Sequence, residues 1–177
     1  SGTPTPTLTP SDVTNAATQV TNAKTQLNGN HNLEVAKQNA NTAIDGLTSL
    51  NGPQKAKLKE QVGQATTLPN VQTVRDNAQT LNTAMKGLRD SIANEATIKA
   101  DQNYTDASPN NRSEYDSAVT AAKAIIGQTT SPSMNAQEIN QAKDQVTAKQ
   151  QALNGQENLR TAQTNAKQHL NGLSDLT

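Results

Sequence analysis

The sequence repeats itself at a spacing of 126 residues. When residues 1–51 are laid over residues 127–177 without a gap, 17 of the 51 positions are identical. The longest matching segment runs from Leu27 to Ala40 and returns from Leu153 to Ala166. The chain is therefore about 1.4 copies of a longer unit taken from a tandem array. Arrays build length and multiply weak contacts, so this pattern favours a scaffold or a multivalent binder over an enzyme.

The composition excludes several classes of protein. Leu, Ile, Val and Phe together number only 28, while Ala contributes 24 residues, which suits thin helices packed closely together. Fifteen basic residues balance fifteen acidic ones, and the absence of a strong basic cluster argues against a nucleic-acid partner. No apolar run approaches 18 residues, so no membrane span is predicted. Cysteine is absent, which excludes disulfides and thiolate sites.

Apolar residues recur every three or four positions along almost the whole chain, and no segment alternates with a period of two. This spacing predicts an all-α protein. Helix-start signals stand at Asn51-Gly52-Pro53, at Ser108-Pro109, and at two segments with capping-box spacing that begin at Asn111 and Asn135. The Pro- and Thr-rich residues 1–10 are predicted to be a flexible lead-in. The predicted helices are 11–28, 32–50, 54–62, 71–99, 111–127, 135–153 and 157–174.

The predicted helix over 71–99 is longer than one small bundle requires. Its 29 residues, at about 1.5 Å each, would reach roughly 44 Å. We therefore expect its first half to close one three-helix bundle and its second half to open the next, so that long shared helices join the bundles into an elongated rod. A proline at Asn94 would then interrupt the shared helix, uncouple the bundles and bend the rod.

The junction at Asn28-Gly29 has two interpretations. The apolar positions Leu27 and Leu33 are six residues apart, where a continued seam would need seven. If the helix runs through Gly29, its apolar face turns there by about 120°. The other interpretation is a plain helix break at Gly29, and the sequence leaves both open.

The residues of these helices carry a family resemblance. Residues 33–88 resemble the GA module, a three-helix bundle of Gram-positive surface proteins, through positions that include Ala36-Lys37, Asn51-Gly52-Pro53-Gln54-Lys55 and Ala65-Thr66-Thr67. Residues 81–153 resemble the FIVAR module, through Tyr104-Thr105, Tyr115, Ile125-Ile126 and Leu153 among others. The implied domains are the last helix of a preceding FIVAR-like module (11–28), a GA-like bundle (29–88), a FIVAR-like bundle (81–153) sharing helix 71–99, and the first helix of a following GA-like module (154–177).

Alternating FIVAR and GA units are typical of giant staphylococcal surface adhesins. The resemblance implies a monomeric, cell-wall-associated rod that binds host matrix proteins such as fibronectin weakly per module and multivalently. The alternative is a stalk that braces the cell envelope and binds no specific ligand. Albumin binding is not carried over, because residues 54–62 contain no aromatic residue and three lysines. No cofactor is implied.

Four residues are candidates for ligand contact. Lys55, Lys57 and Lys59 form a small basic cluster, which is either a solvated helix face or a weak contact for cell-wall polymers or a glycosaminoglycan. Tyr104 is expected to pack on Tyr115, and the alternative is an exposed anchor for a ligand.

The two histidines do not support a metal site. His31 and His169 do not occupy equivalent repeat positions, as a metal site repeated along the array would require. We expect His31 to be solvated and His169 to be partly buried. No catalytic pattern is present, so the chain is not expected to be an enzyme.

Overall fold

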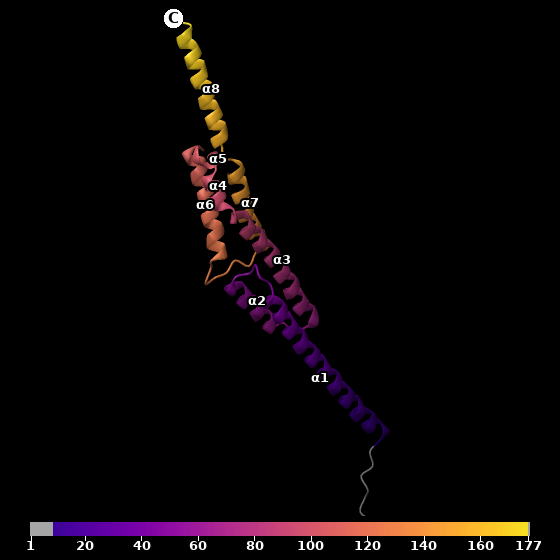
Figure 1. Ribbon diagram of the computed structural model, residues 1–177. Helices are drawn as coiled ribbons and strands as arrows, with labels where there is room; N and C mark the ends of the chain where they lie inside the picture. The colour runs from indigo at the N-terminus through magenta and orange to yellow at the C-terminus, as the bar shows by residue number, and fades with distance from the viewer. Residues whose placement is uncertain (1–8, 177) are drawn as a thin grey trace, which may run out of the picture.

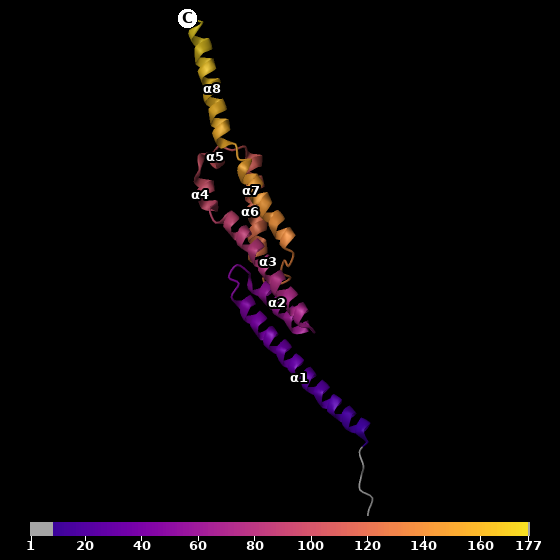
Figure 2. The ribbon, with the colours of Figure 1, turned by 90° about the vertical axis from the view of Figure 1, so that its right-hand side faces the viewer.

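The computed structural model describes residues 9–176, and their regular structure is helical throughout. Figures 1 and 2 show an elongated rod, with α1 reaching toward one end and α8 toward the other. The predicted all-α class and the rod of joined helices are thus confirmed. The helices are α1 (Pro10–Asp45), α2 (Gly52–Gln64), α3 (Leu68–Ile92), α4 (Glu95–Ala100), α5 (Gln102–Thr105), α6 (Pro109–Ile126), α7 (Ala136–Gln151) and α8 (Gly155–Ser174).

The first bundle is formed by the C-terminal half of α1, by α2 and by α3. Its core consists of apolar residues spaced three or four apart, so that each helix presents one apolar stripe to the other two. The fully or nearly fully buried side chains include Ala40, Ile44, Leu58, Val62, Val71 and Ala78. The bundle contains no aromatic side chain, and its interior is correspondingly thin.

The second bundle is formed by α3, α6 and α7, with the short helices α4 and α5 at the end near α8 (Figure 1). Its buried side chains include Leu88, Tyr115, Val119, Ile139 and Val146. Because α3 packs on α1 and α2 and also on α6 and α7, one helix belongs to both bundles. The buried residues of the two bundles form one continuous cluster along the rod.

The shared helix is shorter than the prediction of 71–99. It spans Leu68–Ile92 and ends at Ala93, and a separate helix, α4, begins at Glu95. Near the end of α3 the Ser91 hydroxyl donates to the Leu88 carbonyl at 2.6 Å, and side chains of this kind weaken a helix terminus. The premise of the prediction for proline at Asn94, that the shared helix runs through this residue, is therefore wrong, since Asn94 lies at a helix boundary.

Residues 28 and 29 adopt a helical conformation. Helix α1 is continuous from Pro10 to Asp45, through Gly29, and ends five residues before the predicted position 50. The equivalent junction one repeat later is broken, because α7 ends at Gln151 and α8 begins at Gly155. Two copies of the same Leu-Asn-Gly sequence thus have different backbone structures.

Short polar caps followed by proline start several helices. Thr9 caps α1 and Thr67 caps α3, each by accepting a backbone N–H, and proline follows within two residues. Helix α6 begins at Pro109, so the predicted start at Asn111 is wrong, whereas the Asn135 cap of α7 is confirmed. Pro10 belongs to α1 and not to a lead-in, and residues 1–8 of that segment lie outside the described residues. Among the described helices, none has the length and apolarity to cross a membrane.

Candidate functional site

The start of α2 is held by a reciprocal pair of side chains, Asn51 and Gln54, which we call the junction clasp. The Asn51 Oδ1 accepts from the Gln54 backbone N–H at 2.9 Å, and the Gln54 Oε1 accepts from the Asn51 backbone N–H, also at 2.9 Å. This is a capping box, which satisfies two backbone donors that a helix start otherwise leaves open. Both side chains are buried, so the geometry is fixed by its surroundings.

The remaining amide groups of the junction clasp reach the second bundle. The Asn51 Nδ2 donates to the carbonyl oxygens of Ile125 and Ile126, at 3.2 and 3.3 Å, which are the last two residues of α6. The Gln54 Nε2 donates to the Ser133 carbonyl, between α6 and α7, at 2.8 Å. The last carbonyls of a helix lack the usual partner within it, so Asn51 adds donors at this end of α6, where the Ile125 carbonyl also accepts the Gln128 N–H at 3.5 Å. The clasp therefore joins the two bundles through three part-buried hydrogen bonds.

A second set of contacts fixes the turn between α1 and α2 on the shared helix. The Ser49 N–H donates to the Asn82 Oδ1 at 3.0 Å, and the Arg89 Nε donates to the Ser49 carbonyl at 2.8 Å. Together with the junction clasp, these bonds position α1 and α2 against both α3 and α6. These groups form no reactive arrangement. Their contacts set the relative orientation of the two bundles.

Sequence reasoning did not identify the junction clasp. The spacing Asn51-x-x-Gln54 is a capping-box signal, and it would have located the local half of the arrangement. The carbonyls that receive the other donors lie 74 to 79 residues further along the chain. No local pattern marks them, because any helix C-terminus offers such carbonyls.

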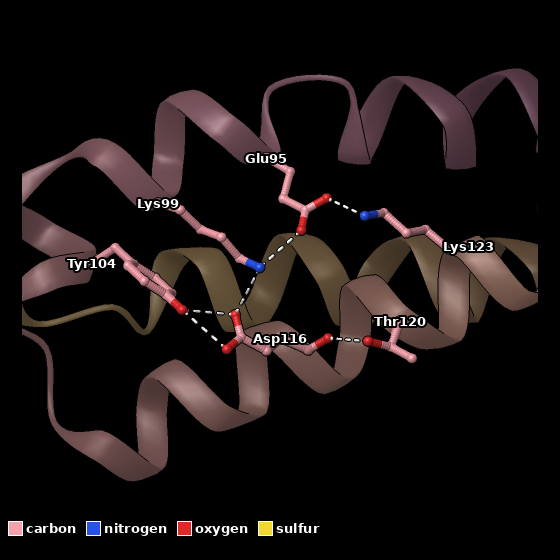
Figure 3. Close-up of polar contacts among 6 residues, drawn as sticks. All are labelled: Glu95, Lys99, Tyr104, Asp116, Thr120 and Lys123. Carbon is pink, nitrogen blue, oxygen red and sulfur yellow. Dashed lines mark hydrogen bonds and ion pairs between the residues drawn. The ribbon is translucent and has the colours of Figure 1, made fainter.

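A network of charged groups lies on the second bundle (Figure 3). The Glu95 carboxylate, whose side chain is 18% exposed, binds the Lys123 Nζ at 2.7 Å and the Lys99 Nζ at 2.9 Å. Its hydrogen bonds to Lys123 and Lys99 lower the pKa of Glu95, and the bond to Glu95 raises the pKa of Lys99. Lys99 also lies 3.5 Å from the Asp116 carboxylate, so the network ties α4 to α6.

Tyr104, on α5, completes this network. Its hydroxyl donates to both carboxylate oxygens of Asp116, at 2.9 and 3.0 Å (Figure 3), and its ring meets Tyr115 edge-on with centroids 6.1 Å apart. The predicted packing of Tyr104 on Tyr115 is confirmed. Burial, followed by the hydrogen bond to Asp116, raises the pKa of Tyr104, and burial likewise raises the pKa of Tyr115.

An open groove of about 720 Å³ runs along α6 beside Tyr104. Small or hydroxyl-bearing side chains form much of its wall, and Arg112 and Asp116 give it one charge of each sign. The lining residues are Tyr104, Pro109, Arg112, Ser113, Asp116, Ser117, Thr120, Ala121 and Ala124. Tyr104 therefore packs on its own bundle and also borders an exposed surface.

The three candidate lysines lie on α2, in the other bundle, so the structure does not bring them together with Tyr104. The Lys55 Nζ donates to the Asp45 carbonyl, at the end of α1, at 3.0 Å, and Lys59 pairs with the Asp45 carboxylate. Lys57 lies 3.8 Å from Glu60. A cation near the C-terminus of a helix is favourable, so Lys55 and Lys59 contribute to holding α1 and α2 together.

Replacing Glu95 with glutamine should show what the charged network contributes. We expect Glu95→Gln to lower the free energy of unfolding by about 1 kcal/mol at neutral pH, because two charge-assisted hydrogen bonds weaken. The pKa of Glu95 is lowered by folding, so its contribution is present above its ordinary pKa of 4.5 and is lost as the pH falls. Urea unfolding of both proteins at pH 7 and pH 3.5 should show the difference shrinking at the lower pH. An equal difference at both pH values would contradict this account.

Within residues 9–176, no cluster of His, Asp and Glu has the arrangement of a metal site. His31 is exposed, as expected. His169 is also exposed, on α8, so the expectation that it is partly buried is wrong. The seam to which it belongs has no partner helix among the described residues.

Comparison with known proteins identifies two kinds of module in this chain. The GA module matches residues 30–84 and 156–177, and the FIVAR domain matches residues 1–28 and 84–154. The chain is 99% identical over 176 residues to the extracellular matrix-binding protein ebh of Staphylococcus aureus strain MW2, and 96% identical over its whole length to EbhB of strain Newman. The chain belongs to the Ebh family of staphylococcal extracellular matrix-binding proteins. It spans 2% of the length of either of these relatives.

Solved structures agree with the Ebh-family assignment. A crystal structure of an EbhA domain from Staphylococcus aureus superposes with a TM-score of 0.85 and 39% identity, covering 95% of this chain and 68% of that one. A structure solved in the characterisation of Embp-mediated Staphylococcus epidermidis adherence to fibronectin has a TM-score of 0.68 and 26% identity, covering 70% of this chain and 98% of that one. This is a family of non-enzymatic helical repeat modules, in agreement with the prediction that the chain is not an enzyme.

Proposed function

We propose that this chain is a segment of a multivalent surface adhesin that binds host matrix protein, with fibronectin as the ligand class. The observation that carries the proposal is the likeness to the structure from Embp-mediated adherence to fibronectin, which extends over 70% of this chain. The repeat of 126 residues supports multivalency, because a contact that is weak in one unit gains avidity along an array. A protein that binds extracellular matrix acts outside the cell, so we place the chain at the cell surface, associated with the cell wall.

Two surfaces are candidates for the contact. The groove beside Tyr104 is open, carries an aromatic edge and one charge of each sign, and would accept an extended polypeptide segment. The basic side of α2 offers the exposed side chain of Lys57, whereas Lys55 and Lys59 are partly occupied by Asp45. We rank the Tyr104 groove above the lysine cluster, because it is an open concave surface that an aromatic side chain borders.

The second candidate function is a stalk without a specific ligand. Positions retained between the two partial copies are mostly Leu, Ala, Val, Gly and Asn at predicted seam or turn positions, and among them Ala40 and Leu50 are buried. A binding array would be expected to retain exposed groups as well. A stalk would act by length and stiffness, and the buried junction clasp is the kind of joint it requires.

Binding of chains with one, two and four tandem units to immobilised fibronectin, at low and physiological salt, separates the two functions. We expect saturable binding whose apparent Kd falls by roughly 10-fold or more from one unit to four, through effective concentration. Albumin and purified cell wall serve as comparison surfaces. Binding that is absent at both salt concentrations, or that is independent of unit number, would contradict the adhesin proposal and favour a stalk without a specific ligand.

Matched variants then locate the contact. Tyr104→Phe keeps the ring packed while removing the hydroxyl, and Arg112→Gln alters the groove charge, so loss of binding in either points to the groove. Neutralising Lys55, Lys57 and Lys59 to glutamine tests the α2 cluster. Its control neutralises Lys24, Lys86 and Lys167, which changes the net charge equally on other helices. An equal loss in both triple variants would indicate general electrostatics and not a site.

A further inference from the structure

Four of the nine glycines follow an asparagine, at residues 28–29, 51–52, 154–155 and 171–172. An Asn-Gly pair is chemically labile, because the glycine has no side chain to hinder attack of its backbone nitrogen on the asparagine Cγ. The attack closes a five-membered succinimide ring, and it is fast only where the backbone lets the two atoms meet. The fold therefore decides which of the four pairs reacts.

Three of the pairs are restrained by their surroundings. Asn28-Gly29 and Asn171-Gly172 lie inside α1 and α8, where the glycine N–H donates to a carbonyl of its own helix. Gly155 is buried against the backbone of Gln102 and Asn103, which leaves no room even for a Cβ. In these pairs the attacking nitrogen is either hydrogen-bonded or enclosed.

Gly52 is in a different environment. It is exposed, and nothing lies within 4 Å of a Cβ built at this position. As the first residue of α2, it has a backbone N–H that no carbonyl of its own helix accepts. Solvent base can therefore reach this N–H, and water can reach the ring that the nitrogen would form. What restrains the reaction is the other partner, Asn51.

The attack requires the Asn51 side chain to leave the junction clasp. Its backbone is extended, with a ψ of 169°, and ring closure needs rotation about this bond until the Gly52 nitrogen lies beside the Asn51 Cγ. The side chain is meanwhile fixed between α2 and α6 by three hydrogen bonds, of 2.9, 3.2 and 3.3 Å, which such a rotation breaks. The rate of ring closure therefore depends on how often the clasp opens.

We propose that Asn51 is a site of spontaneous deamidation, that opening of the junction clasp controls the reaction, and that the product keeps the clasp open. The deprotonated Gly52 nitrogen forms a bond to the Asn51 Cγ, and the bond from Cγ to Nδ2 breaks with release of ammonia. Water then cleaves the ring at either carbonyl and leaves aspartate or isoaspartate at position 51. The net reaction consumes water and releases ammonia.

Either product removes the donors that Asn51 gives to α6. A carboxylate beside the Ile125 and Ile126 carbonyls stands at the negative end of that helix, so it opposes closure. Isoaspartate also carries the main chain through the side-chain carbon, which lengthens the backbone at the start of α2. A clasp that opens and reacts therefore stays open, and the rod loses stiffness irreversibly. The proposal does not depend on matrix binding.

Peptide mass spectrometry of the whole chain measures the reaction at each pair. One sample is kept folded at mildly alkaline pH in water labelled with heavy oxygen, which marks the oxygen gained, and a second is held unfolded in urea. The ratio of the unfolded to the folded rate gives the protection of each asparagine. We expect Asn51 to react in the folded chain and to be less protected than Asn154. Equal protection at these two positions, or no reaction at Asn51 in the folded chain, would overturn the proposal.

Gln128→Ala tests the control exerted by the clasp. The Gln128 Oε1 accepts from the Ser133 N–H at 2.7 Å, and the Ser133 carbonyl in turn accepts from the Gln54 side chain, so the variant loosens the clasp from the second bundle. We expect the Asn51 rate to rise by roughly 2- to 10-fold, as for the loss of one hydrogen bond, while the Asn154 rate stays unchanged. Gln72→Ala, at an exposed position of α3, is the matched control. An Asn51 rate that is equal in both variants would contradict control by the clasp.

Gly52→Ala tests the chemistry. The structure has room for the added methyl group, so the fold should be retained, which circular dichroism checks. The methyl group hinders the backbone nitrogen, so the Asn51 rate should fall in the folded and in the unfolded chain alike. A rate that does not fall would exclude attack by this nitrogen.

The converted chains test the consequence. They carry one additional negative charge, so ion exchange separates them from unreacted chains. We expect chains converted at Asn51 to unfold at lower urea concentration than chains converted at Asn28, where the same charge is gained at an exposed position of α1. Equal midpoints for the two products would overturn the claim that the product keeps the clasp open.

Discussion

Thr83→Pro is expected to destabilise both bundles at once. Thr83 lies on the exposed side of α3, within the part of the helix that serves both bundles, and its hydroxyl donates to the Gln79 carbonyl at 3.0 Å. Proline removes the backbone donor at this position, and its ring clashes with the carbonyl four residues earlier. We expect a loss of about 3 kcal/mol or more, which corresponds to a fall in Tm of roughly 6–12 °C for a chain of this size.

Thr83→Ala separates the backbone effect from the loss of the hydroxyl. Alanine favours the helix, so this variant should be as stable as the native chain or slightly more stable. Small-angle scattering of Thr83→Pro should also show a reduced maximum dimension, because the helix that joins the bundles bends. Asn94→Pro should leave the maximum dimension unchanged, since Asn94 follows the end of α3. A bend in Asn94→Pro and none in Thr83→Pro would contradict the assignment of α3 as the shared helix.

Asn51→Asp is expected to open the junction clasp while preserving the helix cap. Aspartate caps helices as well as asparagine does, so the bond from the Gln54 N–H remains possible. The carboxylate cannot donate to the Ile125 and Ile126 carbonyls, and it places a negative charge against the C-terminal end of α6. We expect the free energy of unfolding to fall by about 2–4 kcal/mol at neutral pH, measured by urea unfolding.

The pH dependence of Asn51→Asp identifies the cause. Burial and the facing carbonyls should raise the folded-state pKa of the new carboxyl group above its unfolded value of about 3.9. A raised pKa means that the variant is closest to the native chain below that value, where the protonated acid can again donate, and that the deficit grows as the pH rises. Gln54→Glu is the matched control, because it exchanges the donor to the Ser133 carbonyl for a carboxylate in the same way. A deficit that is constant between pH 3.5 and pH 7 would contradict the mechanism.

Thr83→Pro and Asn51→Asp bear on function because the contact between the two bundles sets how units are spaced along the rod. If matrix binding is multivalent, the distance and orientation between successive sites determine whether several can engage one ligand. An open junction clasp should therefore weaken binding by a chain of four units more than binding by one unit. The same variant in a non-binding stalk would change only stiffness and length.

Much of the fold could be predicted from the sequence. The 126-residue repeat, the all-α class and the apolar seams, such as Val71, Ala78 and Leu81, follow from residue spacing alone, because an apolar stripe at helical period must be buried against other helices. The packing of Tyr104 on Tyr115 was also predictable, since these are the only two aromatic residues in a chain with little other bulk.

Tertiary structure decided where helices break and which polar groups join the bundles. Residues 27–29 and 153–155 have the same sequence, Leu-Asn-Gly, but the helix breaks only at the second copy. There the Asn154 side chain accepts a hydrogen bond from the Ser108 N–H, and the backbone of segment 102–108 leaves room only for glycine at position 155. The sequence predicted one helix running to residue 99, whereas α3 ends at Ile92 and Glu95, at the start of the separate helix α4, pairs with Lys123 on α6. Asn51 was recognisable as a helix start, whereas its donors to α6 depend on carbonyls brought there by folding. Where the local preferences for continuing and for ending a helix are nearly equal, contacts with residues distant in the sequence decide between them. The spacing of residues along the chain does not record those contacts.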